Sequence, residues 1–229
     1  MEAIILAGGM GTRLRSTISD LPKPMAPVNG KPFLFHLLTW LKEYPVEKII
    51  MSTGYMSESI IEYFGYSFSE IQLEYAVEQA PLGTGGAIKF ALQKCRSANI
   101  LVVNGDTYFP VNLNNFAKFH EDGENLISLA LKPMKSFSRY GNVECKGDTI
   151  IRFNEKTFCS EGLINGGIYL VNKEYFDSLD LPEVFSMESE VFEKQAASSV
   201  LKCMIFDDPF IDIGIPEDYK KAGIFLKGK

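Results

Sequence analysis

The stretch Met1-Glu-Ala-Ile-Ile-Leu-Ala-Gly-Gly-Met-Gly-Thr-Arg-Leu14 decides the fold of this chain. Its residues 3–7 form a short apolar run, which predicts a buried strand. Three glycines follow and predict a tight turn whose backbone N–H groups can approach an anion with no Cβ in the way: Gly8, Gly9 and Gly11. The chain therefore begins with a strand that leads into an anion site.

Two cationic residues follow the glycine turn. Arg13 carries a guanidinium fork that suits phosphate oxygens, and Lys23 stands in Leu21-Pro-Lys-Pro-Met25, where two prolines stiffen its backbone. A dinucleotide-binding fingerprint is excluded because Leu14 occupies the place of its small third residue, and a P-loop is excluded because no G-K-[ST] follows. The pattern indicates a triphosphate site.

Both segments resemble the signature of the sugar-1-phosphate nucleotidylyltransferases, which join a nucleoside triphosphate to a sugar 1-phosphate and release pyrophosphate. The resemblance implies that Arg13 and Lys23 are the catalytic cations. It implies that the nucleotide contacts these residues of the two segments: Leu6, Ala7, Gly8, Gly9, Gly11, Thr12, Arg13 and Lys23.

The resemblance extends along nearly the whole chain and implies one domain over residues 1–229. The implied fold is a Rossmann-like, three-layer α/β/α nucleotidyltransferase domain of the GT-A-like type, with a mostly parallel mixed sheet. Its nucleotide-binding half spans about residues 1–110 and its sugar-phosphate half about 111–229. The sequence lacks the hexapeptide repeats of the C-terminal β-helix in many relatives, so no β-helix is expected.

Composition limits the possible functions. The net charge of −6 and the pI of about 5.1 argue against a nucleic-acid-binding protein with a broad basic surface. No apolar run approaches ~18 residues and no signal peptide precedes the first strand, so we expect a cytoplasmic protein without a membrane span. The cysteines form no CxxC pair and are expected to be free thiols of a reducing cytosol, not zinc ligands: Cys95, Cys145, Cys159 and Cys203.

Strands and helices alternate in the first half of the sequence. The apolar patterns predict helices at 33–41, 58–64 and 87–94, and strands at 48–52, 71–77 and 100–103. This alternation predicts a largely parallel sheet with helices on both faces and ligands beyond the carboxyl ends of its strands. In the second half, shorter strands predict a mixed sheet on the acceptor side: 128–131, 143–145, 149–153 and 167–171.

Two aspartates are candidate magnesium ligands. Asp106 follows the strand at 100–103 in Asn104-Gly-Asp106, and Mg²⁺ prefers one or two carboxylates together with phosphate oxygens and water. The segment Asp212-Ile-Gly-Ile-Pro-Glu-Asp-Tyr219 resembles the family's D-x-G-x-P-E-D-Y, which implies that Asp212 is the second ligand. Each aspartate alone is equally typical of a turn or a helix N-cap.

The segment Glu78-Gln-Ala-Pro-Leu-Gly-Thr-Gly-Gly-Ala87 is the candidate base site. The resemblance implies that the nucleobase meets Glu78 and the chain near Gly83 and Thr84. A carboxylate accepts two hydrogen bonds and so suits guanine N1–H and its 2-amino group, which favours GTP. A backbone carbonyl in place of Glu78 is the alternative reader, and UTP, dTTP or CTP with a hexose or amino-sugar phosphate is the alternative substrate pair.

Three short matches belong to the acceptor side: Arg139-Tyr-Gly-Asn-Val143, Glu155-Lys156 and Asn165-Gly-Gly-Ile-Tyr169. The resemblance implies that they bind the sugar phosphate through Gly141, Glu155, Lys156, Asn165 and Gly166, with Asn165-Gly166 in a hydroxyl-binding turn. It also implies D-glycero-alpha-D-manno-heptose 1-phosphate as the acceptor. Relatives place proline directly after the lysine, where this chain has Thr157 and Phe158.

The expected chemistry needs no general base, because a phosphate monoester has its second pKa near ~6 and is largely dianionic at neutral pH. His36 and His120 are therefore expected to be structural. A non-catalytic regulator that binds nucleotide sugars is the alternative from a different functional class. A homodimer stays open beside a monomer, because short members of the family are often dimers.

Overall fold

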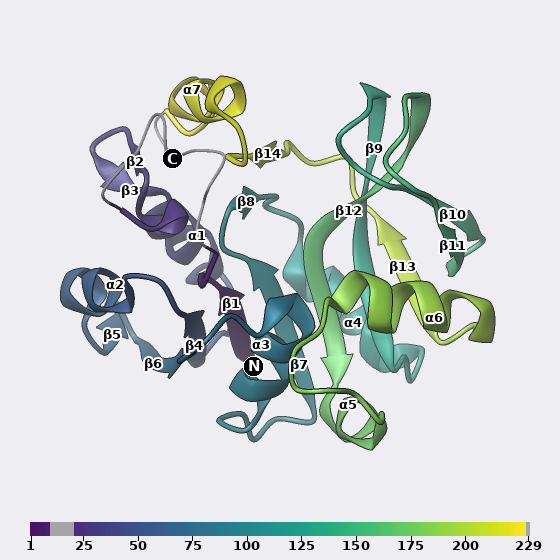
Figure 1. Ribbon diagram of the computed structural model, residues 1–229, viewed down its shortest axis with the longest axis horizontal. Helices are drawn as coiled ribbons and strands as arrows, with labels where there is room; N and C mark the ends of the chain where they lie inside the picture. The colour runs from purple at the N-terminus through teal and green to yellow at the C-terminus, as the bar shows by residue number, and fades with distance from the viewer. Residues whose placement is uncertain (10–20, 228–229) are drawn as a thin grey trace.

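A computed structural model describes residues 1–9 and 21–227 of the chain. In this part of the chain, ten strands form one sheet in the order β10-β11-β13-β9-β12-β7-β1-β4-β6-β5 (Figure 1). Their bounds are β1 Glu2–Leu6, β4 Lys48–Thr53, β5 Ser67–Phe68, β6 Ile71–Val77, β7 Asn99–Asn104, β9 Ile127–Phe137, β10 Asn142–Lys146, β11 Thr149–Phe153, β12 Cys159–Asn172 and β13 Leu201–Ile205. The short strands β2 Pro27–Val28 and β3 Lys31–Pro32 form a separate hairpin.

The N-terminal strand lies in the parallel part of the sheet. β1 pairs in parallel with both β4 and β7, and β4 pairs in parallel with β6. Side chains of a strand alternate between its two faces, and in β1 Ala3 and Ile5 enter one core cluster while Ile4 enters the other. A strand buried on both faces reads as a continuous apolar run, which is why residues 3–7 could be predicted.

Helices cover both faces of the sheet. One core contains buried residues of α1 Phe33–Leu41, α2 Ser57–Phe64, α4 Leu113–Asp122 and α7 Pro216–Phe225. The other contains buried residues of α3 Gly83–Leu92, α5 Lys173–Ser178 and the π-helical turn Glu188–Phe192, which leads into α6 Glu193–Gln195. This arrangement confirms the predicted three-layer α/β/α class.

The second half of the sheet is mixed, as predicted, but mainly antiparallel, so the expectation of a mostly parallel sheet holds only for the first half. β12 pairs antiparallel with both β7 and β9, and β10 pairs antiparallel with β11; β13 runs parallel to β9. The predicted strands at 128–131 and 167–171 are only parts of β9 and β12, which continue to Phe137 and begin at Cys159. The extensions carry polar and glycine residues, so apolar runs alone did not mark them.

Both histidines lie in the core, consistent with the structural roles expected for them. His36 Nε2 lies 3.1 Å from the carbonyl oxygen of Val28, and His120 Nδ1 lies 2.8 Å from Ser128 Oγ. Within residues 1–9 and 21–227, no helix is long and apolar enough to cross a bilayer.

Candidate active site

A cavity of about 310 Å³ lies beyond the carboxyl ends of the parallel strands. Strands β1, β4, β6 and β7 all end at it, and the N-terminal part of α3 closes one side. Its described lining residues are Leu6, Gly8, Gly9, Lys23, Pro24, Ser52, Glu78, Pro81, Gly83, Thr84, Ala87, Asn104 and Asp106. The cavity is therefore where an open α/β sheet is expected to bind a ligand.

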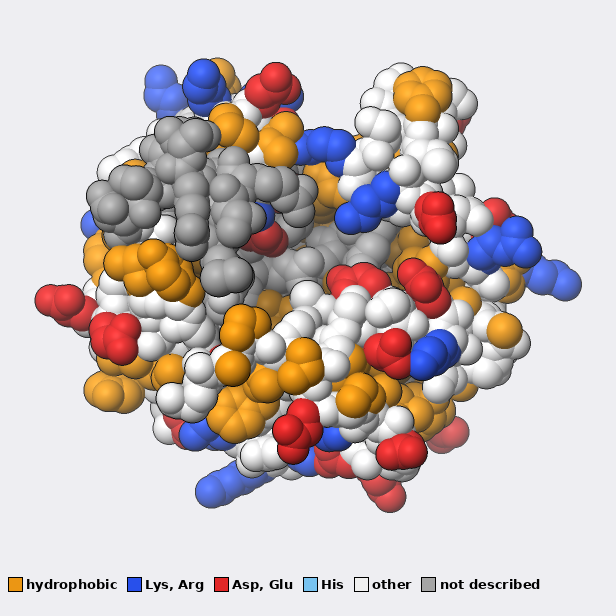
Figure 2. All heavy atoms as spheres, in the orientation of Figure 1, with side chains coloured by type: hydrophobic (Ala, Val, Ile, Leu, Met, Phe, Trp, Pro, Cys, Tyr) orange, Lys and Arg blue, Asp and Glu red, His pale blue; other side chains and the backbone are white. Residues whose placement is uncertain are grey.

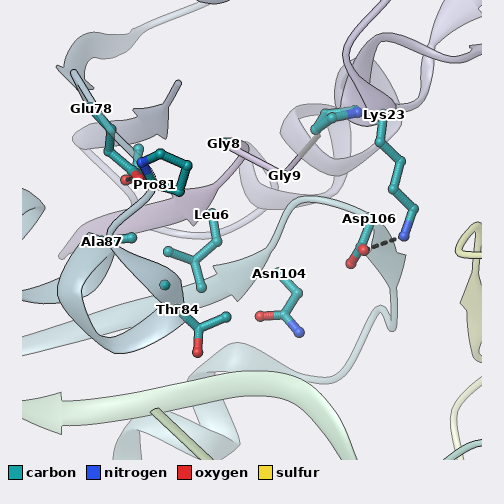
Figure 3. A pocket seen from close by; sticks show the side chains of 13 residues that line it. Leu6, Gly8, Gly9, Lys23, Glu78, Pro81, Thr84, Ala87, Asn104 and Asp106 are labelled. Carbon is teal, nitrogen blue, oxygen red and sulfur yellow. Dashed lines mark hydrogen bonds and ion pairs between the residues drawn. The ribbon is translucent and has the colours of Figure 1, made fainter. Parts of the chain in front are cut away.

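Glu78 lies at one end of this cavity (Figure 3). Its Oε1 accepts a hydrogen bond from Ser52 Oγ at 3.1 Å, and its Oε2 accepts one from the Leu82 N–H at 3.0 Å. A Cβ at Gly8 would stand 3.0 Å from Oε1, so the glycine leaves room for this carboxylate as well as for a ligand. Each carboxylate oxygen keeps a second lone pair, so Glu78 is fixed in orientation and still able to accept.

Lys23 and Asp106 form an ion pair at the opposite end of the cavity (Figure 3). Lys23 stands in a 3₁₀ turn, Lys23–Met25, where it is flanked by two prolines. Its Nζ also lies 3.8 Å from Asp212 Oδ1. The side chains are only partly exposed, at 14% for Lys23, 35% for Asp106 and 21% for Asp212. One ammonium group therefore holds two carboxylates together.

A two-stranded ribbon brings the two aspartates together. Strand β8 Thr107–Tyr108 pairs antiparallel with β14 Ile211–Asp212, and the register places Asp212 opposite Thr107. The Ile213 N–H also donates to the Asp106 carbonyl oxygen at 3.0 Å. Residues more than a hundred positions apart in sequence thus share one end of the cavity, as the predicted metal site requires.

Burial, followed by repulsion from Asp106, raises the pKa of Asp212 above its ordinary value, while Lys23 opposes the shift. The Gly214 N–H donates to Asp212 Oδ1 at 2.6 Å and the Tyr140 hydroxyl donates to Oδ2 at 3.1 Å. Both oxygens of Asp212 are therefore oriented by the protein.

The residues present fit a hard divalent cation. Carboxylate oxygens are the ligands Mg²⁺ prefers, and it keeps sites for phosphate oxygens and water. Among residues 1–9 and 21–227, no group of three or more His, Cys, Asp or Glu side chains forms a complete cage. Asp106 and Asp212 therefore offer a partial site that a substrate would complete. In this structure Lys23 balances the charge of the two aspartates.

The glycines that open α3 pack against protein as well as facing the cavity. A Cβ at Gly85 would lie 2.1 Å from the ring of Phe185, and one at Gly86 would lie 2.3 Å from the Glu183 carbonyl oxygen. Gly83 has φ of +74°, and its Cβ would lie 2.4 Å from the Phe185 carbonyl oxygen. The close passage of the segment 183–185 therefore leaves no room for a side chain at these three positions.

The other residues predicted to bind the nucleotide differ in the groups that they present to the cavity. Thr84 lines the cavity, with its Oγ1 donating to Glu188 Oε2 at 2.8 Å. Ala7 has a fully buried side chain and donates its N–H to the Ser52 carbonyl oxygen at 2.7 Å, so it offers no free N–H. The predicted ligands Gly11, Thr12 and Arg13 lie outside the described residues.

Predicted acceptor residues do not line this cavity in the described part of the chain. Gly141 is needed because a Cβ there would stand 2.7 Å from the Asn154 carbonyl oxygen. Glu155 and Lys156 follow the β10–β11 hairpin and are exposed. The hairpin thus carries all three near one another, at the end away from its tip.

Asn165 and Gly166 were expected in a turn, but they lie inside strand β12 at a break in its register with β9. A Cβ at Gly166 would lie 2.5 Å from the Phe109 ring. Asn165 is held internally, since Nδ2 donates to the Tyr169 hydroxyl at 2.9 Å and Oδ1 accepts from the Gly167 N–H at 2.9 Å. Extra residues in a bulge give the glycine-rich composition that resembles a turn in sequence.

A second cavity of about 390 Å³ reaches the same carboxylate cluster between α7 and the end of β9. Lys and Arg side chains border the hollow in this region of the surface (Figure 2). Their charges are partly compensated, because Asp218 pairs with Arg139 and, at 2.9 Å, with Lys221. Asp218 lies in the first turn of α7 and forms both of these ion pairs.

Sequence reasoning missed three groups at the site. Ser52 orients Glu78, Tyr140 orients Asp212, and Asn104 lines the cavity. Asn104 and Tyr140 were inside recognised motifs but had no assigned role, whereas Ser52 ends an apolar strand without any motif. Their roles depend on which strand ends lie side by side.

A family model described as "Nucleotidyl transferase" matches residues 2–228. The chain belongs to the nucleotidyl transferase family. The membership expected from the N-terminal motifs is confirmed, and members of the nucleotidyl transferase family generally use a divalent metal.

Within the nucleotidyl transferase family, the chain is similar to proteins named D-glycero-alpha-D-manno-heptose 1-phosphate guanylyltransferase. The one from Aneurinibacillus thermoaerophilus is 48% identical over 222 residues, 97% of this chain and 96% of that protein. The one from Campylobacter jejuni is 47% identical over 220 residues, 96% of this chain and 97% of that protein. The crystal structure of HddC from Yersinia pseudotuberculosis complexed with GMP-PN has a TM-score of 0.87 at 33% identity, covering 98% of this chain and 99% of that one.

Proposed function

We propose that this nucleotidyl transferase family member transfers GMP from GTP to D-glycero-alpha-D-manno-heptose 1-phosphate, forming GDP-heptose and pyrophosphate. One observation carries the proposal. A single cavity has an oriented carboxylate at one end and a lysine between two aspartates at the other. Similarity near 48% to proteins named for this reaction supports the choice of both substrates.

The proposed reaction is a direct in-line displacement. An oxygen of the sugar 1-phosphate attacks the α-phosphorus of GTP, and the bond from that phosphorus to the bridging oxygen breaks, so pyrophosphate leaves with the bonding electrons. The nucleophile is already largely deprotonated at neutral pH, since its second pKa is near ~6. The main difficulty is therefore to bring one anion up to another.

Lys23 meets this difficulty at the phosphate end of the cavity. Its ammonium now neutralises Asp106 and Asp212. When a divalent metal, which we propose is Mg²⁺, neutralises these carboxylates instead, the ammonium would turn toward the substrate phosphates. Mg²⁺ held by the two aspartates would supply charge neutralisation at the phosphate oxygens. Arg13, which lies outside the described residues, is proposed as a second cation from its place in the N-terminal motif.

Glu78 is proposed to accept hydrogen bonds from guanine N1–H and its 2-amino group. Ser52 and the Leu82 N–H hold the carboxylate in place for this. Glu78→Gln should lower the ratio of GTP to UTP turnover, because an amide offers one acceptor where guanine needs two. An unchanged ratio would remove Glu78 from base recognition; Ser52→Ala, which loosens the same carboxylate without removing it, is the matched comparison.

The hairpin residues Gly141, Glu155 and Lys156 are proposed to bind the acceptor, with Lys156 on its phosphate and Glu155 on sugar hydroxyls. Asn165 and Gly166 are proposed to shape this side from within β12. Lys156→Ala should raise KM for the sugar phosphate and leave KM for GTP nearly unchanged. An equal rise of both constants would contradict the assignment.

Pyrophosphate release across a substrate matrix tests the whole proposal. GTP, ATP, UTP, dTTP and CTP are each combined with the heptose phosphate, mannose 1-phosphate and glucose 1-phosphate, with Mg²⁺ and with EDTA. We expect Mg²⁺-dependent release with GTP and the heptose phosphate. Release with another pair would overturn the specificity but keep the reaction, and tight nucleotide binding without any release would favour a regulator.

A further inference from the structure

Two cysteines that are distant in sequence meet in the second half of the sheet. Cys145 lies on β10 and Cys203 on β13, 58 positions apart, and their Sγ atoms are 3.4 Å apart. The strands are not direct neighbours, because β11 lies between them. A register shift between Glu144 and Cys145 and a hydrogen bond from the Cys203 N–H to the Asp148 carbonyl oxygen accompany the contact.

The two thiols differ in exposure and in acidity. Cys145 is half-buried, whereas Cys203 is 4% exposed. Cys203 donates its S–H to Cys145, which lowers the pKa of Cys145; the same bond, together with burial, raises the pKa of Cys203. A reagent from solvent therefore meets the more acidic thiol first, with the second thiol directly behind it.

The remaining cysteines lack this arrangement. Cys95 is buried, directs its thiol to the Ala91 carbonyl oxygen at 3.7 Å, and has its pKa raised to about 12, mainly by burial. Cys159 is half-buried at the start of β12, and no thiol contact is recorded for it among the described residues. Cys159 is thus a matched control for Cys145, because it is also half-buried but has no second thiol beside it among the described residues.

We propose that Cys145 and Cys203 form an oxidative modification site, which a low-molecular-weight disulfide such as oxidised glutathione converts to an intramolecular disulfide. The sulfur atoms must approach from 3.4 Å to the bond length of about 2.05 Å.

The exchange proceeds in two balanced steps. The Cys145 thiolate attacks one sulfur of the external disulfide, breaks its S–S bond, and releases one thiolate, leaving a mixed disulfide on Cys145. The Cys203 sulfur, after losing its proton to solvent, then attacks the Cys145 sulfur and releases the second thiolate, and both released thiolates take up a proton. The two protein thiols are oxidised and the external disulfide is reduced to two thiols.

The bridge would fasten the β10–β11 hairpin to β13. It closes a loop of 58 positions, which restricts the unfolded chain. The melting temperature of the oxidised protein should therefore rise by roughly 5–10 °C for a domain of this size. The reaction does not depend on the proposed guanylyl transfer, so either can fail without the other.

The test exposes the folded, full-length protein to oxidised glutathione, blocks the remaining thiols, and identifies peptides by mass spectrometry without reduction. We expect a peptide pair joined through Cys145 and Cys203, a loss of two of the four free thiols, and the higher melting temperature. Cys159→Ser should behave in the same way. Cys203→Ser should stop at the first step, with glutathione retained on Cys145.

Two results would overturn the proposal. Persistent glutathione on Cys145 in the unsubstituted protein would show that Cys203 does not reach it. Reaction at Cys159 in preference to the pair would show that exposure alone governs oxidation. Melting curves of each reduced variant, recorded in parallel, distinguish loss of the bridge from loss of the fold.

Discussion

The pH dependence of stability should contain a contribution from His120, a core residue on α4. The residue is 1% exposed, its Nδ1 lies 2.8 Å from Ser128 Oγ, and its Nε2 has no hydrogen-bond partner among the described residues. Burial lowers the pKa of His120 from 6.5 to about 4. The unfolded chain therefore takes up a proton at a higher pH than the folded chain does.

The sign and size of the pH effect on the free energy of unfolding follow from this difference in pKa. A lowered pKa in the folded state gives stability that is present above pH 6.5 and is lost as the pH falls toward 4. Integrating the proton uptake of the two states gives a loss of about 2 kcal/mol between pH 7 and pH 5, and about 3 kcal/mol by pH 4.

The assay compares urea unfolding of the protein and of His120→Gln at pH 7 and pH 5. Glutamine retains a polar group for Ser128 and does not titrate, and the carboxylates that also titrate are common to both proteins. The free energy of unfolding of the unsubstituted protein should fall by about 2 kcal/mol more than that of the variant. Equal losses would refute the reasoning, whatever the offset between the two proteins at pH 7.

Further expectations concern the α3 glycines and the carboxylate cluster. Gly85→Ala places a Cβ 2.1 Å from the Phe185 ring and should cost about 1–3 kcal/mol in urea unfolding; an unchanged midpoint would show that the ring simply moves. Tyr140→Phe removes the donor to Asp212 and should raise the Mg²⁺ concentration for half-maximal rate roughly 10-fold or more, with an unshifted Mg²⁺ titration as the contrary result. Lys23→Ala should lower turnover at saturating substrates about 10²–10³-fold, and near-normal turnover would contradict its role.

Local sequence patterns were sufficient for several elements. The helix at 33–41 and the strands at 71–77 and 149–153 have their predicted bounds, because each segment contains its own apolar pattern and is flanked by turn residues. The N-terminal motif likewise indicated the family, since its glycines and cations are close in sequence. The strand β12 was underestimated because Asn165-Gly166-Gly167 looks like a turn when its two sheet neighbours are unknown.

By itself, the sequence determined the start of the fold, the family, and the kinds of side chain available to the candidate site. The resemblance paired Asp212 with Asp106, but only the tertiary structure decided that the β8–β14 ribbon brings them together, and that Cys203 meets Cys145. The physical reason is that periodicity records how each segment is buried. Which distant segments then lie side by side is decided by strand pairing and packing across the whole domain, and residue types close in sequence carry no record of it.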